Sequence, residues 1–240
     1  MKWSNRLLMA LLILLAGGIL TSNMVLKNEY VKVDKTDNYW NYSKVLEQPF
    51  KHIKIEGGNN TKIVFEQSPH YSVRILNDWQ RYHRSLVTSL VKNDTLFLKF
   101  IYTGKEGNEK NYMKYTTLVR IFAPQLLSVD GNNTNFEMDK MRQKNIAVSM
   151  SGKSVFELES MIPDLDSLTI FTKDSSGVVF EMSPEYKISE SFHVNKIQAA
   201  LKDASFLHVG HASVDTLNLN IAPFAGIVLS GNSLNKMTGK

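Results

Sequence analysis

The sequence has 240 residues, of which 43% are hydrophobic and 10% aromatic, with only six prolines, and this composition excludes a largely disordered chain. The absence of cysteine excludes disulfides, thiolate metal sites, a cysteine nucleophile and the lipidated cysteine of a bacterial lipoprotein. The net charge of +5 is uneven, with nine Lys or Arg against four Asp or Glu over residues 74–120 and eight against thirteen over 125–235. Because the basic positions alternate with apolar ones, as on the wet face of a sheet, they argue against a nucleic-acid partner.

A basic start and a long apolar run occupy residues 1–26. Lys2 and Arg6 precede the apolar stretch 7–20, which resumes at Met24 after three polar residues and ends at Leu26. Twenty helical residues at ~1.5 Å each span the ~30 Å hydrocarbon layer of a membrane. The segment therefore predicts a transmembrane signal anchor that crosses the membrane through residues 7–26, with a cytoplasmic N-terminus favoured by the basic start.

Two other interpretations of this segment stay open. A signal peptide cleaved after Ala16-Gly17-Gly18 would leave a chain that starts near Ile19, although a cleaved apolar region usually ends at its cleavage site and this one continues. A buried core helix would need protein on every side, because the run has no polar face. The anchor predicts an inner-membrane protein with its folded part in the bacterial periplasm, whereas cleavage predicts a secreted or surface-exposed protein.

Residues 27–49 are predicted to be a juxtamembrane linker, whose aromatic residues rest at the membrane interface or cover the first strand.

From Phe50 onward nearly every apolar residue falls at a period of two, which predicts half-buried strands joined by tight turns such as Gly58-Asn59-Asn60. The turn pair Asn93-Asp94 lies between two alternating segments. It favours a β-hairpin over a helix that would begin at Asp78.

A repeated pattern begins near Leu126 and is the most informative feature of the sequence. Triplets of mostly apolar residues at alternating positions recur at intervals of 22, 29 and 20 residues, and a polar or glycine corner and a second alternating strand follow most of them. The triplets are Ile146, Val148 and Met150; Leu168, Ile170 and Thr172; Ile197, Ala199 and Leu201; and Leu217, Leu219 and Ile221.

Such a period predicts an all-β domain over residues 50–235, built as a right-handed parallel β-helix or solenoid-like stack with an N-terminal β-hairpin region. Each coil would bury its inward residues on the coils above and below, ~4.8 Å away. The longer interval predicts a loop over Ser183–Asn195 that projects from one coil. An antiparallel meander also shows alternation and is the alternative, although it gives no reason for corners to recur at nearly fixed spacing.

The order of these motifs resembles the auto-transporter adhesin head GIN domain family (DUF2807), which is common in Bacteroidetes. The residues that carry the resemblance are Phe50-x-x-Ile53-x-Ile55-x-Gly57-Gly58, Ile63, Gln67, Tyr71-x-Val73-x-Ile75, Val91-x-Asn93-Asp94-x-Leu96, Val119-x-Ile121-x-Ala123-Pro124-x-Leu126 and Ser151-Gly152-x-Ser154. The resemblance covers roughly residues 50–232. It implies a β-helix-like fold, a cell-envelope location and an adhesion or binding role, and it carries no catalytic residue.

Two small groups of residues could bind a metal ion or act in catalysis. His208 and His211 could bind one metal ion only if Gly210 makes a corner between them, because residues three apart in a strand face opposite sides. Asp164 and Asp166 follow Pro163 and would suit a paired-carboxylate glycosidase, but two acids at this spacing are more often an exposed turn. Nucleophile-elbow, Walker and dinucleotide-binding glycine motifs are absent from the sequence.

The sequence therefore predicts no catalytic residue, no cofactor and no metal. It predicts a non-enzymatic, adhesin-like binding protein of the cell envelope whose partner is a glycan or an envelope protein, with contacts near the loop Ser183–Asn195 and the basic hairpins of Arg81–Lys114. A carbohydrate-active β-helix enzyme and a structural or signalling component of the envelope are the alternatives. The ligand and the oligomeric state are not predicted.

Overall fold

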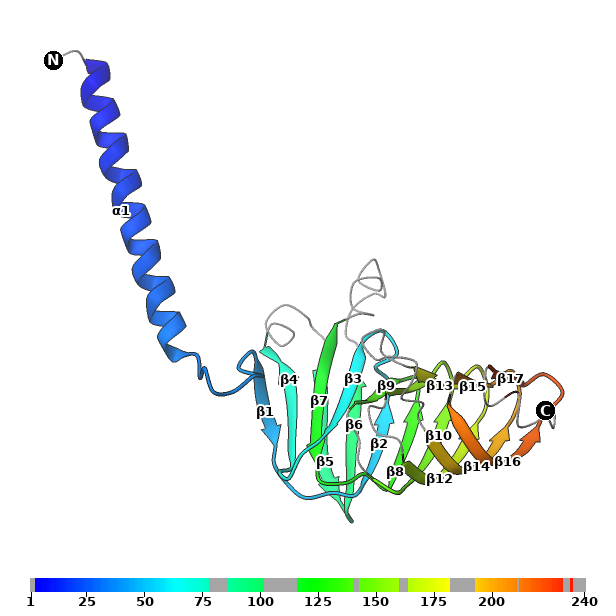
Figure 1. Cartoon of the computed structure of the whole chain (residues 1–240). Helices are drawn as coiled ribbons and strands as arrows, with labels where there is room; N and C mark the ends of the chain where they lie inside the picture. Colours follow the sequence, from blue (N-terminus) through cyan, green and yellow to red (C-terminus); the bar gives the residue numbers. More distant parts are fainter. Residues whose placement is uncertain are drawn as a thin grey trace. The chain divides into compact units, whose positions relative to one another are not determined.

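The computed structural model describes residues 3–77, 86–101, 116–139, 143–159, 164–181, 193–210, 212–230 and 234. The chain divides into two compact units, Met1–Asn41 and Tyr42–Lys240. The first unit contains one helix, and the second is built from strands (Figure 1). The chain is therefore mostly β with one N-terminal helix, as the sequence predicts.

The first unit is the helix α1 (Trp3–Lys32) and the turns that follow it. No residue of α1 is buried, and the helix is long and apolar enough to cross a membrane, a test that a signal sequence also passes. It extends six residues beyond the predicted end at Leu26. The turns beyond it are closed by carboxylates, since Asp34 accepts hydrogen bonds from Thr36 and Asp37 accepts one from the backbone N–H of Tyr39.

The second unit consists of two mixed β-sheets. Sheet A has nine strands, in the order β1 (Tyr42–Leu46), β4 (Ser72–Leu76), β7 (Thr117–Ala123), β3 (Lys62–Gln67), β9 (Asn135–Asp139), β11 (Val155–Glu159), β13 (Gly177–Glu181), β15 (Phe206–Gly210) and β17 (Gly226–Leu229). Sheet B has eight, in the order β16 (Ser213–Ile221), β14 (His193–Leu201), β12 (Asp164–Thr172), β10 (Asn145–Ser151), β8 (Ser128–Asn132), β2 (His52–Glu56), β6 (Thr95–Ile101) and β5 (Leu86–Lys92). Strand β1 lies inside the range predicted to be a linker.

From β8 to β17 the chain alternates between the two sheets, and each strand pairs in parallel with the strand two positions further along the chain. We call each sheet B strand together with the sheet A strand that follows it a rung. The pairing register matches the predicted triplets, because Ile146 lies opposite Leu168, which lies opposite Ile197, which lies opposite Leu217. The predicted repeat is confirmed, and the antiparallel meander is wrong for this part of the chain.

The N-terminal rungs follow a different order. The rung β2/β3 lies between β6/β7 and β8/β9 and pairs in parallel with both. Strand β4 runs antiparallel to β7, strand β5 antiparallel to β6, and β1 forms the outer edge beyond β4. The predicted hairpin is confirmed as β5–β6, with its turn residues Asn93 and Asp94 at φ 50° and 57°.

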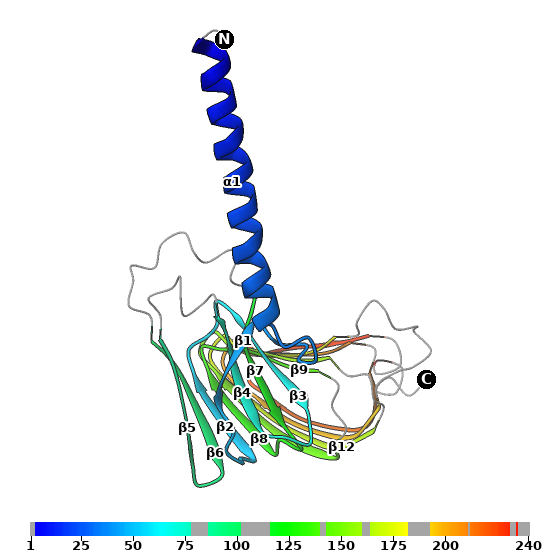
Figure 2. The same cartoon turned by 90° about the vertical axis from the view of Figure 1, so that its left-hand side faces the viewer.

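The hydrophobic core lies between the two sheets, which Figure 2 shows from the β1 end. Alternate residues of the strands point inward, and equivalent residues of neighbouring rungs lie on top of one another. The rings of Phe136 and Phe156, for example, lie 5.9 Å apart and nearly parallel. Each fully buried large apolar side chain contributes about 1.5–3 kcal/mol through removal from water. The largest of them are Phe50, Phe65, Phe136, Phe156, Ile53, Ile55, Ile63, Ile75, Leu96, Leu98, Leu118 and Ile121.

Candidate functional site

The candidate site is built on the corners where strands of sheet B turn into strands of sheet A. At these corners the residues Asn133, Gly152, Asp174 and Asp203 adopt positive φ angles of 51°, 66°, 60° and 52°. Glycine takes this conformation without strain, and Asn and Asp tolerate it better than other residues do. The sequence signal for three of these corners was correct, because Gly152, Asp174 and Asp203 each come directly after one of the predicted triplets.

Side chains of one corner bind the backbone of the corner before or after it. The carboxylate of Asp174 accepts a hydrogen bond from the backbone N–H of Gly152 (2.9 Å), and that of Asp203 accepts one from the N–H of Asp174 (3.1 Å). In the opposite direction, Asn133 Oδ1 accepts the N–H of Lys153 at 3.0 Å. These contacts fix the corners against one another and hold the polar side chains in a row.

Buried hydroxyl groups support the corners from inside. Ser154 and Ser176 are 0% exposed, and Ser205 is 1% exposed. Ser154 Oγ donates to the carbonyl of Ser151 and accepts the N–H of Thr134, and Ser176 Oγ lies within hydrogen-bond distance of the carbonyl of Met150 in the preceding rung. These bonds matter because a buried polar group without a partner costs about 1–3 kcal/mol.

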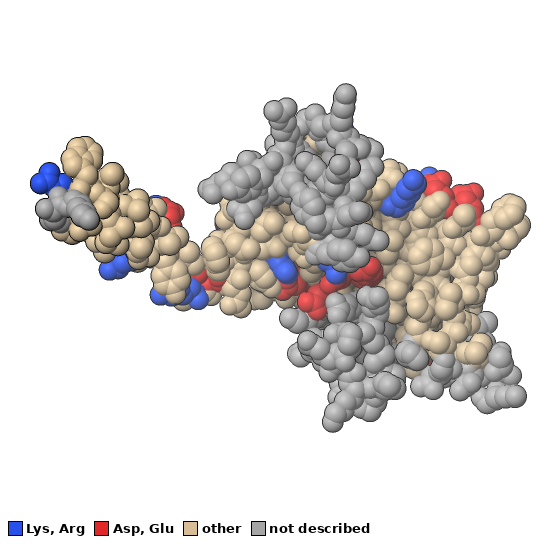
Figure 3. All heavy atoms as spheres, turned by 90° about the horizontal axis from the view of Figure 1, so that it is seen from above, with Lys and Arg blue, Asp and Glu red and all other residues tan. Residues whose placement is uncertain are grey.

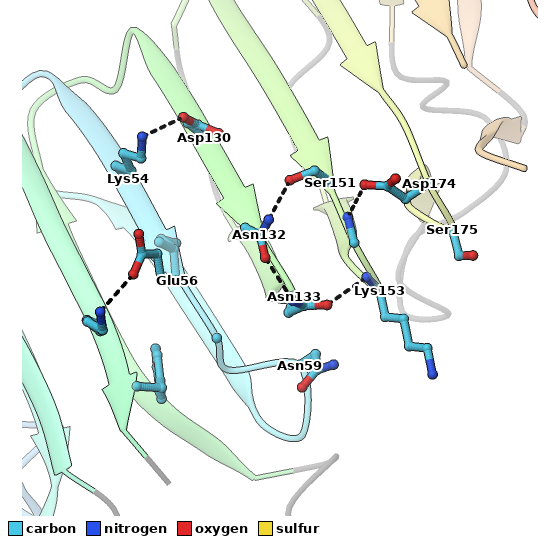
Figure 4. A pocket seen from close by; sticks show the side chains of 15 residues that line it. Lys54, Glu56, Asn59, Asp130, Asn132, Asn133, Ser151, Lys153, Asp174 and Ser175 are labelled. Carbon is cyan, nitrogen blue, oxygen red and sulfur yellow. Dashed lines mark hydrogen bonds and ion pairs between the residues drawn. The ribbon is translucent and has the colours of Figure 1, made fainter. Parts of the chain in front are cut away.

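A groove of about 1030 Å³ runs across the outer side of these corners. It crosses the strands β6, β2, β8 and β10 and reaches the corner after β12, so that it is assembled from five neighbouring strands (Figure 4). Most of the described residues that line it are polar or charged. They are Lys54, Ile55, Glu56, Gly57, Asn59, Lys99, Phe100, Asp130, Asn132, Asn133, Ser151, Gly152, Lys153, Asp174 and Ser175.

Among the described residues that line the groove, three are lysines and three carry carboxylates, so their charges balance. Lys99 pairs with Glu56 at 3.2 Å and Lys54 with Asp130 at 3.6 Å, each across neighbouring strands. All four side chains are at least half exposed, so each pair contributes about 0–1 kcal/mol and opens readily to a ligand. Lys153 extends away from the corner row in Figure 4.

Amides and hydroxyls complete the groove and supply both donors and acceptors. Asn132 Nδ2 donates to Ser151 Oγ at 3.0 Å, and Asn133 Nδ2 donates to Asn132 Oδ1 at 2.8 Å. Phe100 is 7% exposed, so its ring adds little apolar surface to the groove. The arrangement suits a hydroxyl-rich ligand, because it offers rows of hydrogen-bonding groups at strand spacing without a net charge.

A second charged cluster lies on the outer face of sheet A. Lys62 pairs with Glu137, which is 7% exposed, and lies 4.0 Å from Glu157, while Arg120 pairs with Glu66. On the face drawn in Figure 3, acidic and basic side chains likewise lie next to one another. Because its charges are paired within the sheet, this cluster fits a structural role.

The predicted histidine pair is only half described. His208 lies in β15 opposite Val179 and Val228, and Gly210, the last residue of this strand, has a φ of 60°. His211 lies outside the described residues. Within the described residues no three His, Asp or Glu side chains gather in a group that could hold a metal ion.

The predicted carboxylate pair lies in a strand and not in a turn, since β12 begins at Asp164. Asp166 Oδ1 accepts a hydrogen bond from Asn195 (3.1 Å) and lies 3.4 Å from Lys144 Nζ. This carboxylate therefore connects neighbouring rungs. The side chain of Asp164 is not described.

Other predicted contact regions lie largely outside the described residues. The projecting loop was predicted over Ser183–Asn195, of which residues 193–195 are described, as the start of β14. Of the basic region Arg81–Lys114, the described part is residues 86–101, which form β5 and β6 and contain Lys92 and Lys99. The groove itself was missed by sequence reasoning, which identified its corners only as turns.

Comparison with known proteins gives structural matches only. Similar solved structures include a "putative adhesin" of Bacteroides fragilis (14% identity, TM-score 0.45, covering 78% of this chain and 95% of that one) and a "putative adhesin" of Parabacteroides distasonis (14%, 0.40, 75% and 77%). A third is a "putative lipid binding protein" of Parabacteroides distasonis (13%, 0.38, 79% and 94%). No family model and no curated protein matches the sequence. Membership of the head GIN family therefore stays a prediction, and the function is inferred from this chain's own residues.

Proposed function

We propose that this chain is a membrane-tethered, non-enzymatic binding module of the bacterial cell envelope that holds a neutral, hydroxyl-rich glycan in the corner groove. The observation that carries the proposal is the lining of the groove, in which paired charges, amides and hydroxyls from five neighbouring strands face one open channel. The bound glycan would lie across the strands and make many weak contacts.

A right-handed β-solenoid is the scaffold that we propose for the site. The parallel pairing of every second strand from β8 to β17 supports it, because the chain must then wind around the core once per rung. Connections between parallel strands of one sheet are right-handed in about 98% of cases. A scaffold of this kind is rigid along its length, so it presents the groove residues at fixed spacing.

The balance of charges distinguishes the ligand classes. A nucleic acid would need an excess of Lys and Arg, whereas the groove has three cations and three anions. A protein partner would need an exposed apolar centre in the groove, whereas Ile55 and Phe100 in its lining are 1% and 7% exposed. A neutral glycan needs only hydrogen-bond donors and acceptors, which the groove supplies.

Binding without catalysis is supported by the chemistry of the groove side chains. The described lining residues include no histidine, and each of their acids has a partner: Glu56 and Asp130 pair with lysines, and Asp174 accepts the N–H of Gly152. Glycoside hydrolysis would need two carboxylates that face each other across a scissile bond, one of them protonated at neutral pH. No two of the described acids in the groove are paired with each other.

The tether is supported by α1, which contains a stretch long and apolar enough to cross a membrane. A helix of this kind would hold the β unit at the periplasmic side of the inner membrane. Membrane fractionation and mass measurement of the N-terminus test this part of the proposal. A chain that begins near Ile19 and is found in the soluble fraction would exclude the anchor.

The glycan site is tested with the full-length chain in lipid nanodiscs. The chain is first screened on an array of neutral and uronate-containing oligosaccharides. It is then titrated by calorimetry with the neutral oligosaccharide that binds best. Ser175 is exposed on the groove wall, so Ser175→Tyr should block the groove and weaken binding at least about tenfold, or 1.4 kcal/mol. The matched control is Ala204→Tyr, at the equivalent corner position one rung further and outside the groove.

The expected result is that Ala204→Tyr binds like the wild type and that incubation with the ligand yields no cleavage product. Absence of binding to any glycan on the array, or an equal loss in both variants, would overturn the proposed site. A cleavage product would instead support the enzyme alternative.

A further inference from the structure

The last rung of the stack, β16/β17, has two free strand edges. Within the described residues, β16 pairs only with β14 and β17 pairs only with β15, so each presents one row of backbone groups without a strand partner (Figure 1). Free edges of this kind bind further strands, and proteins usually protect them with charges, bulges or short strands.

The inward side chains of this rung are incompletely covered. Leu217, Leu219, Ile227 and Leu229 pack against the core but are only partly buried, whereas their counterparts in the preceding rung, Ile197 and Leu207, are 0% exposed. Ile221 at the end of β16 is 40% exposed. The rung therefore behaves like an interior rung that lacks its outer neighbour.

The two ends of the stack differ in charge and in strand length. At the opposite end, β1 has five residues, contains Lys44 and has a register shift between Lys44 and Leu46. In the last rung, β17 is also short, with four residues and a register shift against β15. Strand β16, in contrast, has nine residues and no register shift, and Asp215 is the only charged residue among residues 212–230. Asp215 is paired with His193 at 3.0 Å. In Figure 3 this end of the domain is drawn largely without charged side chains.

The shape of the two ends limits what can cover the last rung. Here both sheets end together, with β16 and β17. At the opposite end β5 is the last strand of sheet B, whereas sheet A continues past β4, which flanks β7, by one more strand, β1. A copy added head to tail would meet this step and could not pair with both edges. A second copy related by a two-fold axis normal to the sheets would place its β16 beside β16 and its β17 beside β17, so that both edges pair at once. Because this arrangement uses the same end of both copies, it forms a closed dimer and adds no further copies.

We propose that the last rung is a self-association surface, on which a second copy of this chain pairs end to end in antiparallel fashion and continues both sheets across a two-fold axis. The near absence of charge allows this contact, because like-charge repulsion between identical surfaces is avoided. Two groups of partly exposed Leu and Ile side chains then complete each other's cover.

The chain contains no cysteine, so single cysteines report the contact directly. In an antiparallel pair that obeys two-fold symmetry, one residue lies opposite its own copy, with Cα atoms about 4.5–5.5 Å apart, which is within disulfide range. Each position from Val214 to Asn220 is replaced by cysteine in turn, in the full-length chain in detergent micelles under mild oxidation. One position should give a strong disulfide dimer, and its two immediate neighbours should give little. Control cysteines at Ala147 and Ser149, on the outer face of β10, should give none.

A second measurement separates this contact from association through α1. The variant Leu219→Lys/Ile227→Lys places charges at the proposed contact, and it should convert the dimer to a monomer by light scattering while circular dichroism stays that of the wild type. A wild-type monomer without any edge disulfide would overturn the proposal, and would indicate that the chain's own residues or another protein cover the rung. Equal cross-linking from β10, or a dimer that survives the double substitution, would also overturn it.

Discussion

The carboxylate of Asp203 accepts a hydrogen bond from the backbone N–H of Asp174, which lies 29 residues earlier in the chain, at 3.1 Å. Asp174 does the same for Gly152 at 2.9 Å. Asp174 and Asp203 also adopt positive φ angles, so one residue type both makes the corner and connects it to the preceding rung. The stack is therefore held by polar contacts at its corners as well as by its apolar core.

Replacing Asp203 tests this double role. Asp203→Ala removes the hydrogen bond and places a Cβ without polar compensation at φ 52°, so unfolding should be easier by about 1.5–3 kcal/mol. Asp203→Gly removes the same bond but relieves the backbone, and should cost less. Thermal unfolding of the full-length variants, followed by circular dichroism, checks the order. Equal stability of the Ala and Gly variants would contradict the strain argument.

The inner half of the same corner gives a second test. Thr172 Oγ1 donates to Ser205 Oγ at 2.9 Å, and both side chains are buried. Ser205→Ala leaves the Thr172 hydroxyl poorly satisfied and should cost about 1–3 kcal/mol, whereas the double variant Thr172→Val/Ser205→Ala should cost less than the two single losses together. One rung further along the stack, Leu201 takes the position of Thr172, and Ala225 takes the position of Ser205. The chain thus already tolerates an apolar pair at these positions. Additive losses in urea unfolding would contradict this coupling.

The register of the repeat could be predicted because it depends on local patterns. Apolar triplets, followed by corners with small or Asx residues, recur at spacings that fix which residue lies opposite which, as with Ile146 and Leu168. The corners at Gly152 and Asp174 follow from the same pattern, because few residues other than Gly, Asn and Asp tolerate the left-handed conformation.

The order of the N-terminal rungs could not be predicted in this way. His52 pairs with Ser128, 76 residues later, because β2 lies between β6 and β8, and no local signal specifies that insertion. The groove depends on this pairing, since Lys54 and Asp130 meet only across it. Sequence patterns therefore identified the groove's corner residues as turns, but they did not reveal that these residues share one surface with Lys54 and Glu56.

A glycine on the outer face of sheet A provides a packing test. A Cβ at Gly177 would lie 2.2 Å from the ring of Phe206, which packs over this position from the next rung. Gly177→Ala should therefore displace the ring and cost about 1–3 kcal/mol in thermal unfolding. Gly226, on the other side of Phe206, is the matched control, because a Cβ there meets nothing within 4 Å. A loss in Gly226→Ala as large as that in Gly177→Ala would exclude this explanation.

The ion pairs of the two sheets should differ sharply in their contribution to stability. The Glu137 side chain is 9% exposed and pairs with Lys62, so Lys62→Met would leave a carboxylate largely buried without its cation, at a cost of about 3–5 kcal/mol. Lys144 and Asp166 form a pair of the same type with side chains 63% and 45% exposed, and Lys144→Met should cost less than about 1 kcal/mol. Urea unfolding of both variants at neutral pH measures the difference. The variant Lys62→Met/Glu137→Gln should recover part of the lost stability, because it removes the uncompensated charge. A double variant no more stable than Lys62→Met would show that Lys62 acts through packing.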